Sequence, residues 1–415
     1  MPKYLKQALQ AQQSKPSARP RASTSAPRVG LALAGGGPLA AVYEIGALAA
    51  LAEAVDGLDL NDAKIYVGVS AGAIIAAGLA NGITPHQMCR LFIESDVDAV
   101  DGAILFKPET LLRPAMQEFR KRLASAPGLL ASSAFHYARN RASVASSFER
   151  MKEVLPAGFF SGDAIGRFLK GTFAKAGRSN DFRKLRNKLI IVATDLDTGK
   201  AVRFGEPGFD STPISVAVQA SAAVPGLFPP VEIGGHHFVD GALRKTMHAS
   251  IALEEGVDLL LCVNPIVPYN ARFQRGARKL AKGGLLDVLS QTLRSILHSR
   301  LETGLASYQI SHPEVDILLF QPSQDDAELF FTNIFSYNNR RRMCEQAYQN
   351  TRLMLWQQRA ELGERLARHG MALKLAVLRD TSLSLVSQKP VHKPLAQLDV
   401  ALGDLERYLK VAHGI

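Results

Sequence analysis

The chain has 415 residues, of which 47% are hydrophobic and 21% charged, and its net charge is +11. These values are typical of a folded protein with one large or two ordinary domains, and they exclude a chain that is disordered throughout. The three cysteines, Cys89, Cys262 and Cys344, are widely spaced and form no CxxC pair. They exclude a disulfide framework or a structural zinc cluster and favour a reducing compartment.

The positive charge is concentrated near the N-terminus. Residues 1–28 contain six Lys or Arg side chains and no acidic one, so this segment carries +6 of the +11. We expect a disordered basic tail that attracts anionic lipid, an Arg- and Ser-rich transit peptide being the alternative. The rest of the chain shows no basic face interleaved with aromatic residues, so nucleic acid is not an expected partner.

The sequence also predicts where the protein acts. Residues 1–28 lack the apolar region of a secretory signal peptide. The best candidate for a spanning helix, residues 66–80, is shorter than the roughly 20 residues that a bilayer requires. We therefore expect a cytoplasmic protein, peripheral at the membrane, without a signal peptide or a transmembrane helix.

In chain order, the first elements alternate between strand and helix. Apolar runs at 29–34 and 65–69 predict strands, and 42–55 and 71–79 predict helices. Such alternation is typical of a parallel sheet with right-handed crossovers. Residues 83–185 are helical in pattern, and we expect a helical insertion there.

Strand patterns resume after the insertion, at 189–194, 201–204, 230–239, 259–263 and 315–320. Between the last two, a row of leucines spaced three or four residues apart predicts a helix with a core-facing stripe, made of Leu286, Leu289, Leu293, Leu297 and Leu301.

The C-terminal part is predicted to be mainly helical. Residues 340–368 predict one long amphipathic helix that starts with three solvated arginines, Arg340, Arg341 and Arg342. Residues 395–411 predict a last helix. The expected organisation is a disordered tail at 1–28, a main domain at 29–375 and a C-terminal extension at 376–415.

A GxSxG sequence, residues 68–72, lies where a predicted strand turns into a predicted helix. A nucleophilic serine on such a tight turn needs glycines on either side, because they let the strand and the helix pack closely around it. The helix N-terminus that follows offers positive potential to an oxyanion. Ser70 is therefore the candidate nucleophile, and a serine in an ordinary packed turn is the alternative.

Three consecutive glycines, Gly35, Gly36 and Gly37, follow the first predicted strand. Backbone N–H groups without neighbouring Cβ atoms can approach a substrate carbonyl, so this run predicts an oxyanion hole. With Ala40 it also fits a dinucleotide-binding GxGxxA pattern. That pattern expects an acidic residue at the end of the second strand, where Ser70 stands instead, so we favour the oxyanion hole.

An apolar strand ends in Asp240-Gly241, a typical place for a carboxylate at the edge of a sheet, with an Asx turn as the alternative. His236 and His237 suggest a Ser-His-Asp triad, but we interpret them as surface hairpin residues. Asp195 is interpreted as a turn carboxylate, and the three cysteines as small buried apolar residues.

Five segments together resemble the patatin-like phospholipase family: GLALAGGG at 30–37, GVSAG at 68–72, ATDLDTG at 193–199, ASAAVPGLFPP at 220–230 and DGA at 240–242. Their order and spacing agree over roughly residues 29–265. The resemblance implies an α/β fold, three-layer α/β/α with a mainly parallel central sheet, and a catalytic dyad in place of a triad. By position it implies the following roles: Ser70 as nucleophile, Asp240 as general base, Gly35, Gly36 and Gly37 as oxyanion hole, with Gly68, Gly72 and Gly241 supporting these motifs.

The resemblance further implies hydrolysis of lipid acyl esters, of the phospholipase, lysophospholipase or lipase type, at a membrane surface and without a metal or an organic cofactor. A transacylase or thioesterase with the same dyad stays open, as does a non-catalytic lipid-binding or scaffold protein. The chain departs from the family in two places. Pro38-Leu39-Ala40 stands where the family has a basic residue and a glycine, and residues 244–248 replace the family's Asn and Pro after DGA.

Overall fold

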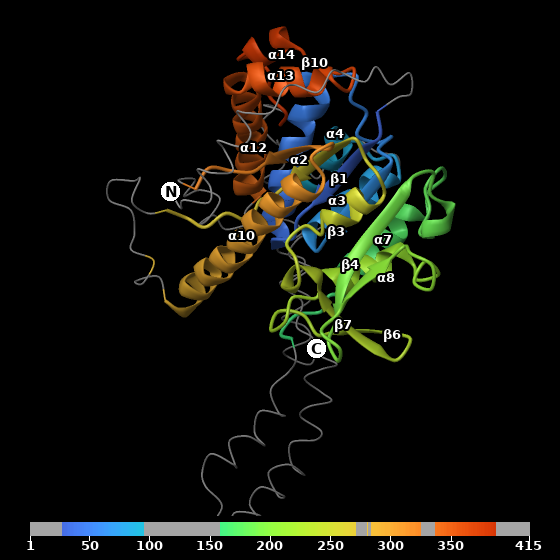
Figure 1. Ribbon diagram of the computed structural model, residues 1–415. Helices are drawn as coiled ribbons and strands as arrows, with labels where there is room; N and C mark the ends of the chain where they lie inside the picture. Colours follow the sequence, from blue (N-terminus) through green and yellow to red (C-terminus); the bar gives the residue numbers. More distant parts are fainter. Residues whose placement is uncertain (1–26, 95–157, 271–279, 281–283, 325–336, 387–415) are drawn as a thin grey trace, which may run out of the picture. The chain divides into compact units, whose positions relative to one another are not determined.

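The computed structural model describes residues 27–94, 158–270, 280, 284–324 and 337–386. The described residues up to Leu385 belong to one compact unit. Its centre is an eight-stranded sheet of order β6-β7-β4-β3-β1-β8-β9, with β5 paired to β4 (Figure 1). The strands are β1 (Val29–Leu33), β3 (Ile65–Val69), β4 (Lys188–Asp195), β5 (Ala201–Phe204), β6 (Val231–Ile233), β7 (His236–Asp240), β8 (Leu259–Val263) and β9 (Asp316–Phe320).

Five neighbouring strands, β4, β3, β1, β8 and β9, run parallel to one another. Every residue of β1, β3 and β8 is buried, as expected of parallel strands that are covered on both faces. The strands β5, β6 and β7 pair antiparallel at one side. The sheet is therefore mainly parallel, as the sequence predicted.

Helices cover both faces of this sheet. On one face lie α2 (Gly37–Ala54), α3 (Ala71–Ala80) and α8 (Ile214–Ser221), and α2 packs along α12 (Tyr337–Gln357) (Figure 1). Gly46 permits that approach, because a Cβ there would lie 2.4 Å from the carbonyl oxygen of Cys344. On the other face, α9 (Ser250–Glu254) and α10 (Leu285–Ser311) close a core with alternate residues of the strands. The result is a three-layer α/β/α arrangement.

The remaining elements are short or peripheral. They are β2 (Val55–Asp56), which pairs antiparallel with β10 (Ala372–Leu373), and the helices α4 (Pro85–Met88), α7 (Asp163–Phe173), α13 (Arg359–Ala367) and α14 (Leu375–Arg379). A π-helical turn spans Cys89–Glu94, and 3₁₀ turns span Phe182–Lys184 and Gly241–Leu243.

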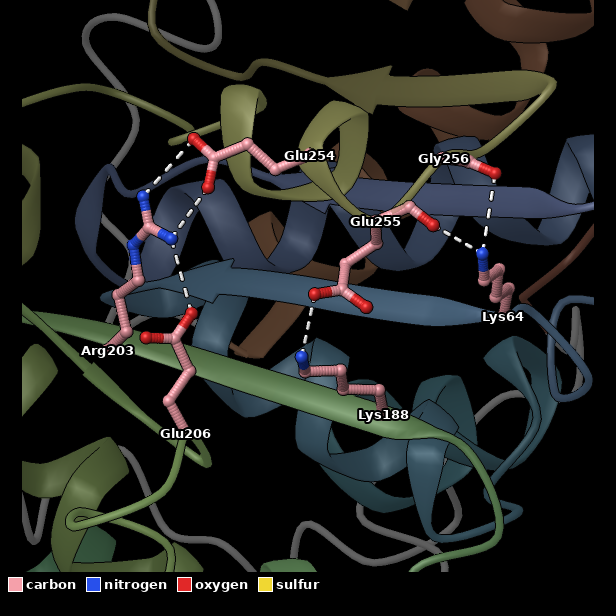
Figure 2. Close-up of polar contacts among 7 residues, drawn as sticks. All are labelled: Lys64, Lys188, Arg203, Glu206, Glu254, Glu255 and Gly256. Carbon is pink, nitrogen blue, oxygen red and sulfur yellow. Dashed lines mark hydrogen bonds and ion pairs between the residues drawn. The ribbon is translucent and has the colours of Figure 1, made fainter.

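A group of ion pairs fastens α9 and the residues after it to β4 and β5 of the sheet (Figure 2). Lys188 of β4 pairs with Glu255 at 2.7 Å, and Arg203 of β5 pairs with Glu254 at 2.7 Å and with Glu206 at 3.2 Å. Lys64, just before β3, donates to the carbonyl oxygen of Glu255. Each exposed pair contributes up to about 1 kcal/mol, so the group fixes the position of α9 more than it raises stability.

The leucine stripe predicted to face the core does so only at its C-terminal end. Leu297 and Leu301 are buried, whereas Leu289 and Leu293 are 54% and 46% exposed, and the side chain of Leu286 lies outside the described residues. A spacing of four residues advances about 400° along a helix of 3.6 residues per turn. The row therefore winds around α10, and its two ends face different surroundings.

Two other predictions about the elements were wrong in detail. The predicted strand 230–239 is a hairpin of β6 and β7, which turns at Gly234 and Gly235, both at positive φ. The predicted single helix 340–368 is interrupted at Gln358, which separates α12 from α13.

The predicted solvation of the three arginines is also wrong for two of them. Arg340 is 5% exposed and donates to the Phe92 carbonyl at 3.2 Å, and Arg341 pairs with Glu94 at 3.6 Å. Of the three, Arg342 alone is exposed.

Several predicted segments lie wholly or partly outside the described residues, namely the tail at 1–26, the middle of the insertion at 95–157 and the last helix at 395–411. The described ends of the insertion contain α4, α7 and the turns at Cys89–Glu94 and Phe182–Lys184, with irregular residues between them and an isolated bridge at Gly158. Arg28, assigned to the tail, pairs with Asp258 at 2.7 Å. All three cysteines are buried and unpaired, as predicted.

Among the described helices, α2 is long and apolar enough to cross a bilayer by length and composition. However, 67% of its 18-residue window is buried inside the protein, against α3 and α12 among others. This burial indicates a core helix.

Candidate active site

Ser70 lies at a strained turn between β3 and α3. Its φ of 53° and ψ of −117° place a non-glycine residue in a region that costs about 1–3 kcal/mol. The flanking glycines permit the turn: a Cβ on Gly68 would lie 2.6 Å from Ala73 Cα, and one on Gly72 would lie 2.5 Å from the Leu33 oxygen. The side chain is placed at the carboxyl edge of the sheet and is 2% exposed.

Asp240 ends β7, where it pairs with Ala193 of β4. Gly241 then passes so close to β4 that a Cβ on it would lie 2.2 Å from the Val192 oxygen. This passage turns the chain beneath the neighbouring strand β3 and brings Asp240 to Ser70. The sheet register therefore unites two residues that are 170 positions apart in the sequence.

The Asp240 carboxyl group is 3% exposed, and this burial raises its pKa to about 6. The nearby Ser70 hydroxyl and a hydrogen bond from the Ala242 N–H at 2.8 Å oppose the shift. Burial is the larger effect because it disfavours the charged form of an acid. Asp240 is thus a carboxylate at neutral pH with a basicity well above that of an exposed aspartate.

The glycine run follows β1, the strand next to β3, and reaches the site from the other side. A Cβ on Gly35 would lie 3.0 Å from Ser70 Cβ and 3.1 Å from Ala242 Cβ, so the backbone passes between them. The N–H of Gly35, which was predicted as one of three oxyanion donors, instead donates to the Thr246 carbonyl at 3.3 Å. Among the described residues, no acceptor contacts the N–H groups of Gly36 and Gly37, which start α2.

Pro38 and Ala40 fit this start of α2. Pro38 occupies one of the first helical positions, where the missing N–H costs no helical hydrogen bond. Ala40 is 2% exposed, and its Cβ would lie 2.8 Å from a Cβ on Gly36. The departure from the family pattern is therefore compatible with an ordered glycine loop.

Ser221, which the sequence did not single out, holds the turn at Ser70 in place. It is fully buried at the end of α8, and its hydroxyl accepts the Ser70 N–H at 2.8 Å and donates to the Val192 carbonyl at 2.6 Å. Its place within the segment at 220–230 that matches the family was the available signal.

The segment after Asp240 is also part of the support. Thr246 is 3% exposed, and besides accepting from Gly35 it donates its hydroxyl to the Leu297 carbonyl of α10 at 3.1 Å. His248 is 6% exposed and contacts the Gly241 carbonyl through Nε2 at 3.3 Å. Burial lowers the pKa of His248 to about 4, so the ring is neutral and donates to that carbonyl.

The other titratable residues considered for catalysis form ion pairs and hydrogen bonds away from Ser70. His236 and His237 are exposed on the hairpin and pair with Asp195 at 3.2 Å and with Asp197 at 3.9 Å. Asp195 Oδ1 accepts the N–H groups of Asp197 and Thr198, both at 3.0 Å, and the bond from Thr198 contributes most to lowering its pKa. It is a turn carboxylate.

A cavity of about 240 Å³ lies next to the site, on the side of α8. It is lined by residues that include Ala222, Ala223 and Phe228, and the Ala223 carbonyl accepts the Asp240 N–H at 3.0 Å. Within the described residues, no group of three or more His, Cys, Asp or Glu side chains is arranged to hold a metal ion.

Comparison with known proteins gives a family and several structures. The model of the patatin-like phospholipase family matches residues 31–253. Among solved structures, the chain is similar to VipD from Legionella pneumophila, at 16% identity and a TM-score of 0.37, over 79% of this chain and 66% of VipD. It is also similar to the type III effector protein ExoU, at 18% identity and a TM-score of 0.34, over 79% of this chain and 52% of ExoU.

A structure of full-length ExoU from Pseudomonas aeruginosa in complex with SpcU is matched at 18% identity and a TM-score of 0.28, over 68% of this chain and 53% of that one. The chain thus spans less than two thirds of the length of VipD and about half of ExoU.

Proposed function

Because this chain belongs to the patatin-like phospholipase family, we propose that it is a serine hydrolase that cleaves acyl esters of lipids, with Ser70 as nucleophile and Asp240 as general base. The observation that carries the proposal is the position of the Ser70 hydroxyl beside the buried Asp240 carboxyl group, close enough to lower the pKa of that group. Of the described histidines, His236 and His237 pair with Asp195 and Asp197 on the hairpin instead of with Ser70 or Asp240.

In the first half of the reaction, Asp240 takes the proton of Ser70 as the serine oxygen attacks the ester carbonyl. The N–H groups of Gly36 and Gly37 and the N-terminus of α2 stabilise the negative charge on the tetrahedral intermediate. The protonated Asp240 then gives its proton to the leaving alcohol, and an acyl group stays on Ser70.

In the second half, Asp240 takes a proton from a water molecule, which attacks the acyl-enzyme. The tetrahedral intermediate collapses, the fatty acid leaves, and Ser70 regains its proton from Asp240. The raised pKa of Asp240 supports this role, because a carboxylate with a pKa of about 6 accepts a proton more readily than an exposed one.

A fluorophosphonate probe and a panel of lipid esters test the proposal together. Wild type should be labelled at Ser70 and should hydrolyse at least one phospholipid, lysophospholipid or neutral lipid of the panel. Ser70→Ala should do neither while keeping the same circular dichroism spectrum. Hydrolysis by pure Ser70→Ala would exclude this site, and folded wild type that is neither labelled nor active would favour a lipid-binding or scaffold protein.

The same panel separates hydrolysis from acyl transfer. With an added alcohol or lysolipid acceptor, a hydrolase releases mainly fatty acid, whereas a transacylase forms mainly the new ester. We expect fatty acid as the main product, at a membrane surface and without an added cofactor.

A further inference from the structure

The first half of α10 exposes four apolar side chains on one side of the helix: Val288 (42%), Leu289 (54%), Leu293 (46%) and Ile296 (52%). At about 100° per residue, Leu289, Leu293 and Ile296 fall within about 60° of one another. We call these four residues the apolar face of α10. In Figure 1 the first turns of α10 extend away from the sheet.

The opposite side of α10 is tied down, so the apolar face is held outward. The Gln291 side chain bonds both the N–H and the carbonyl of Tyr269, at 3.1 and 2.8 Å. Six residues further, the buried Leu297 offers its carbonyl to the Thr246 hydroxyl. Rotating the helix to bury the apolar face would break these bonds.

Hydrogen bonds connect α10 to the segment that follows Asp240 in the candidate active site. Thr246, which holds Leu297, also accepts the Gly35 N–H of the glycine loop. Arg300, one turn beyond Ile296, donates to the carbonyl groups of Leu243 and Arg244, three and four residues after Asp240. A ligand seated on this face is therefore next to the loop that carries Asp240.

The charges beside the apolar face are mainly positive. Leu243, Arg244 and Lys245 are exposed in succession. Residues 241–248 contain no acidic side chain, and residues 285–300 contain one, Asp287. Apolar side chains flanked by cations are the combination that binds anionic bilayers, because the apolar groups insert at the acyl boundary while the cations attract the headgroups.

We propose that the apolar face of α10, together with Leu243, Arg244 and Lys245, docks this protein onto a lipid bilayer that carries anionic headgroups, with the loop that follows Asp240 toward the lipid. The inference rests on the proposed function, since a lipid substrate requires such contact. Charge complementarity favours the bilayer over a second copy of the chain, because two cationic surfaces repel when they meet face to face.

The test measures vesicle binding by the full chain in a Ser70→Ala background, so that the lipid is not consumed. Flotation with phosphatidylcholine vesicles, with and without phosphatidylserine, compares the parent with Leu289→Glu and Leu293→Glu. Each variant should bind the anionic vesicles at least about tenfold more weakly, since it replaces an inserted apolar group by a charge that the headgroups repel. The matched control is Leu353→Glu on α12, where the leucine is 52% exposed, and it should bind like the parent.

A second arm tests the cations. The double variant Arg244→Gln/Lys245→Gln should weaken binding to anionic vesicles by about fivefold or more for each charge removed, with little change for pure phosphatidylcholine. Binding that is the same with and without phosphatidylserine would overturn the anionic part of the proposal.

Activity measurements with Ser70 restored separate this inference from the proposed function. Leu289→Glu should hydrolyse a short soluble ester like wild type but vesicle lipid more slowly. Vesicle binding that depends on Leu289, in a protein without any hydrolysis, would support the surface and reject the hydrolase. Normal vesicle binding by both glutamate variants would overturn the surface whether or not the protein is a hydrolase, and so would a dimer that Leu289→Glu dissociates without changing vesicle binding.

Discussion

The Ser221 hydroxyl accepts the backbone N–H of Ser70 at 2.8 Å, and both residues are almost completely buried. Through its second bond, to the Val192 carbonyl, Ser221 joins the strained turn at Ser70 to β4. The nucleophile is thus fixed by a side chain 151 positions further along the chain.

We predict that Ser221→Ala lowers both stability and turnover. The buried Ser70 N–H loses its acceptor, which costs about 1–3 kcal/mol in the free energy of unfolding. The strained turn is then free to relax, so kcat should fall more than KM changes. Ser215→Ala is the control: Ser215 is buried on the same helix and bonds Asn180 at 3.0 Å, so it should lose stability but keep kcat. Equal kcat values for the two variants would show that Ser221 is only structural.

The pKa of Asp240 predicts the pH dependence of hydrolysis. Only the carboxylate can take the proton of Ser70, so kcat/KM should rise with pH and level off above about pH 6. Asp240→Asn should remove most of the activity at every pH. A rise in kcat/KM centred near pH 7 or above in wild type would point to a different base.

The same carboxyl group should limit stability. Its pKa is 3.8 in an ordinary environment and about 6 in the folded protein, so folding favours the protonated form. The stability that this group contributes is therefore complete below about pH 4 and is lost as the pH rises through 6. A tenfold difference in proton affinity between the folded and the unfolded chain corresponds to about 1.4 kcal/mol. Asp240→Asn should unfold at a higher temperature than wild type at pH 7 and show a smaller difference at pH 4.

The hairpin histidines should be dispensable. His236 and His237 are exposed and pair with acids of the turn at 195–198, so their removal should leave kcat/KM within about twofold of wild type. A loss of about a thousandfold in either alanine variant, as expected for a triad member, would revive a Ser-His-Asp mechanism.

Glu44 of α2 predicts a second pH effect on stability. It is fully buried, neither carboxylate oxygen has a hydrogen-bond partner among the described residues, and burial raises its pKa well above 4.5. The Ala34 N–H, which opposes this shift, already donates to the Val263 carbonyl. Wild type should lose stability as the pH rises above about 4.5, and Glu44→Gln should lose less of it.

Glu53 of the same helix is the control, because its pKa is shifted in the opposite direction. Its hydrogen bond with His86 lowers its pKa, so its contribution to stability is present at neutral pH and is lost as the pH falls through the lowered value. Chemical unfolding of Glu44→Gln and Glu53→Gln from pH 3 to 8 checks both. A wild-type slope that Glu44→Gln leaves unchanged would contradict the first prediction.

The parallel centre of the fold could be predicted because its residues are apolar on both faces. Residues 65–69 and 259–263 match β3 and β8 residue for residue, since each run is bounded by polar or small residues. Gly234-Gly235 is a sequence typical of a hairpin turn. The apolar residues on both sides of it nevertheless favoured the prediction of a single strand. The break between α12 and α13 at Gln358 contains no Gly or Pro, the residues that mark a helix end in a sequence. Its position therefore depends on tertiary packing.

The candidate site likewise contains residues that the sequence predicted and residues that it did not. Ser70, the glycine run and Asp240 lie at strand ends and have local patterns, and the structure brings them together at one edge of the sheet. Ser221 and Thr246 act through hydrogen bonds to residues far away in the chain, so their own neighbours in the sequence carry little sign of it. The exposure of Leu289 and Leu293 depends on what packs against α10, which periodicity alone does not contain.

Two consecutive residues of β4, Val192 and Ala193, contact the segments that position both Ser70 and Asp240. Val192 accepts from Ser221 and limits the approach of Gly241, and Ala193 pairs with Asp240. If β4 separates from β3, the nucleophile and the base lose their alignment together, whatever remains folded elsewhere. Heat inactivation should therefore be all-or-none and should coincide with amide exchange in the middle of β4, without a partly active intermediate.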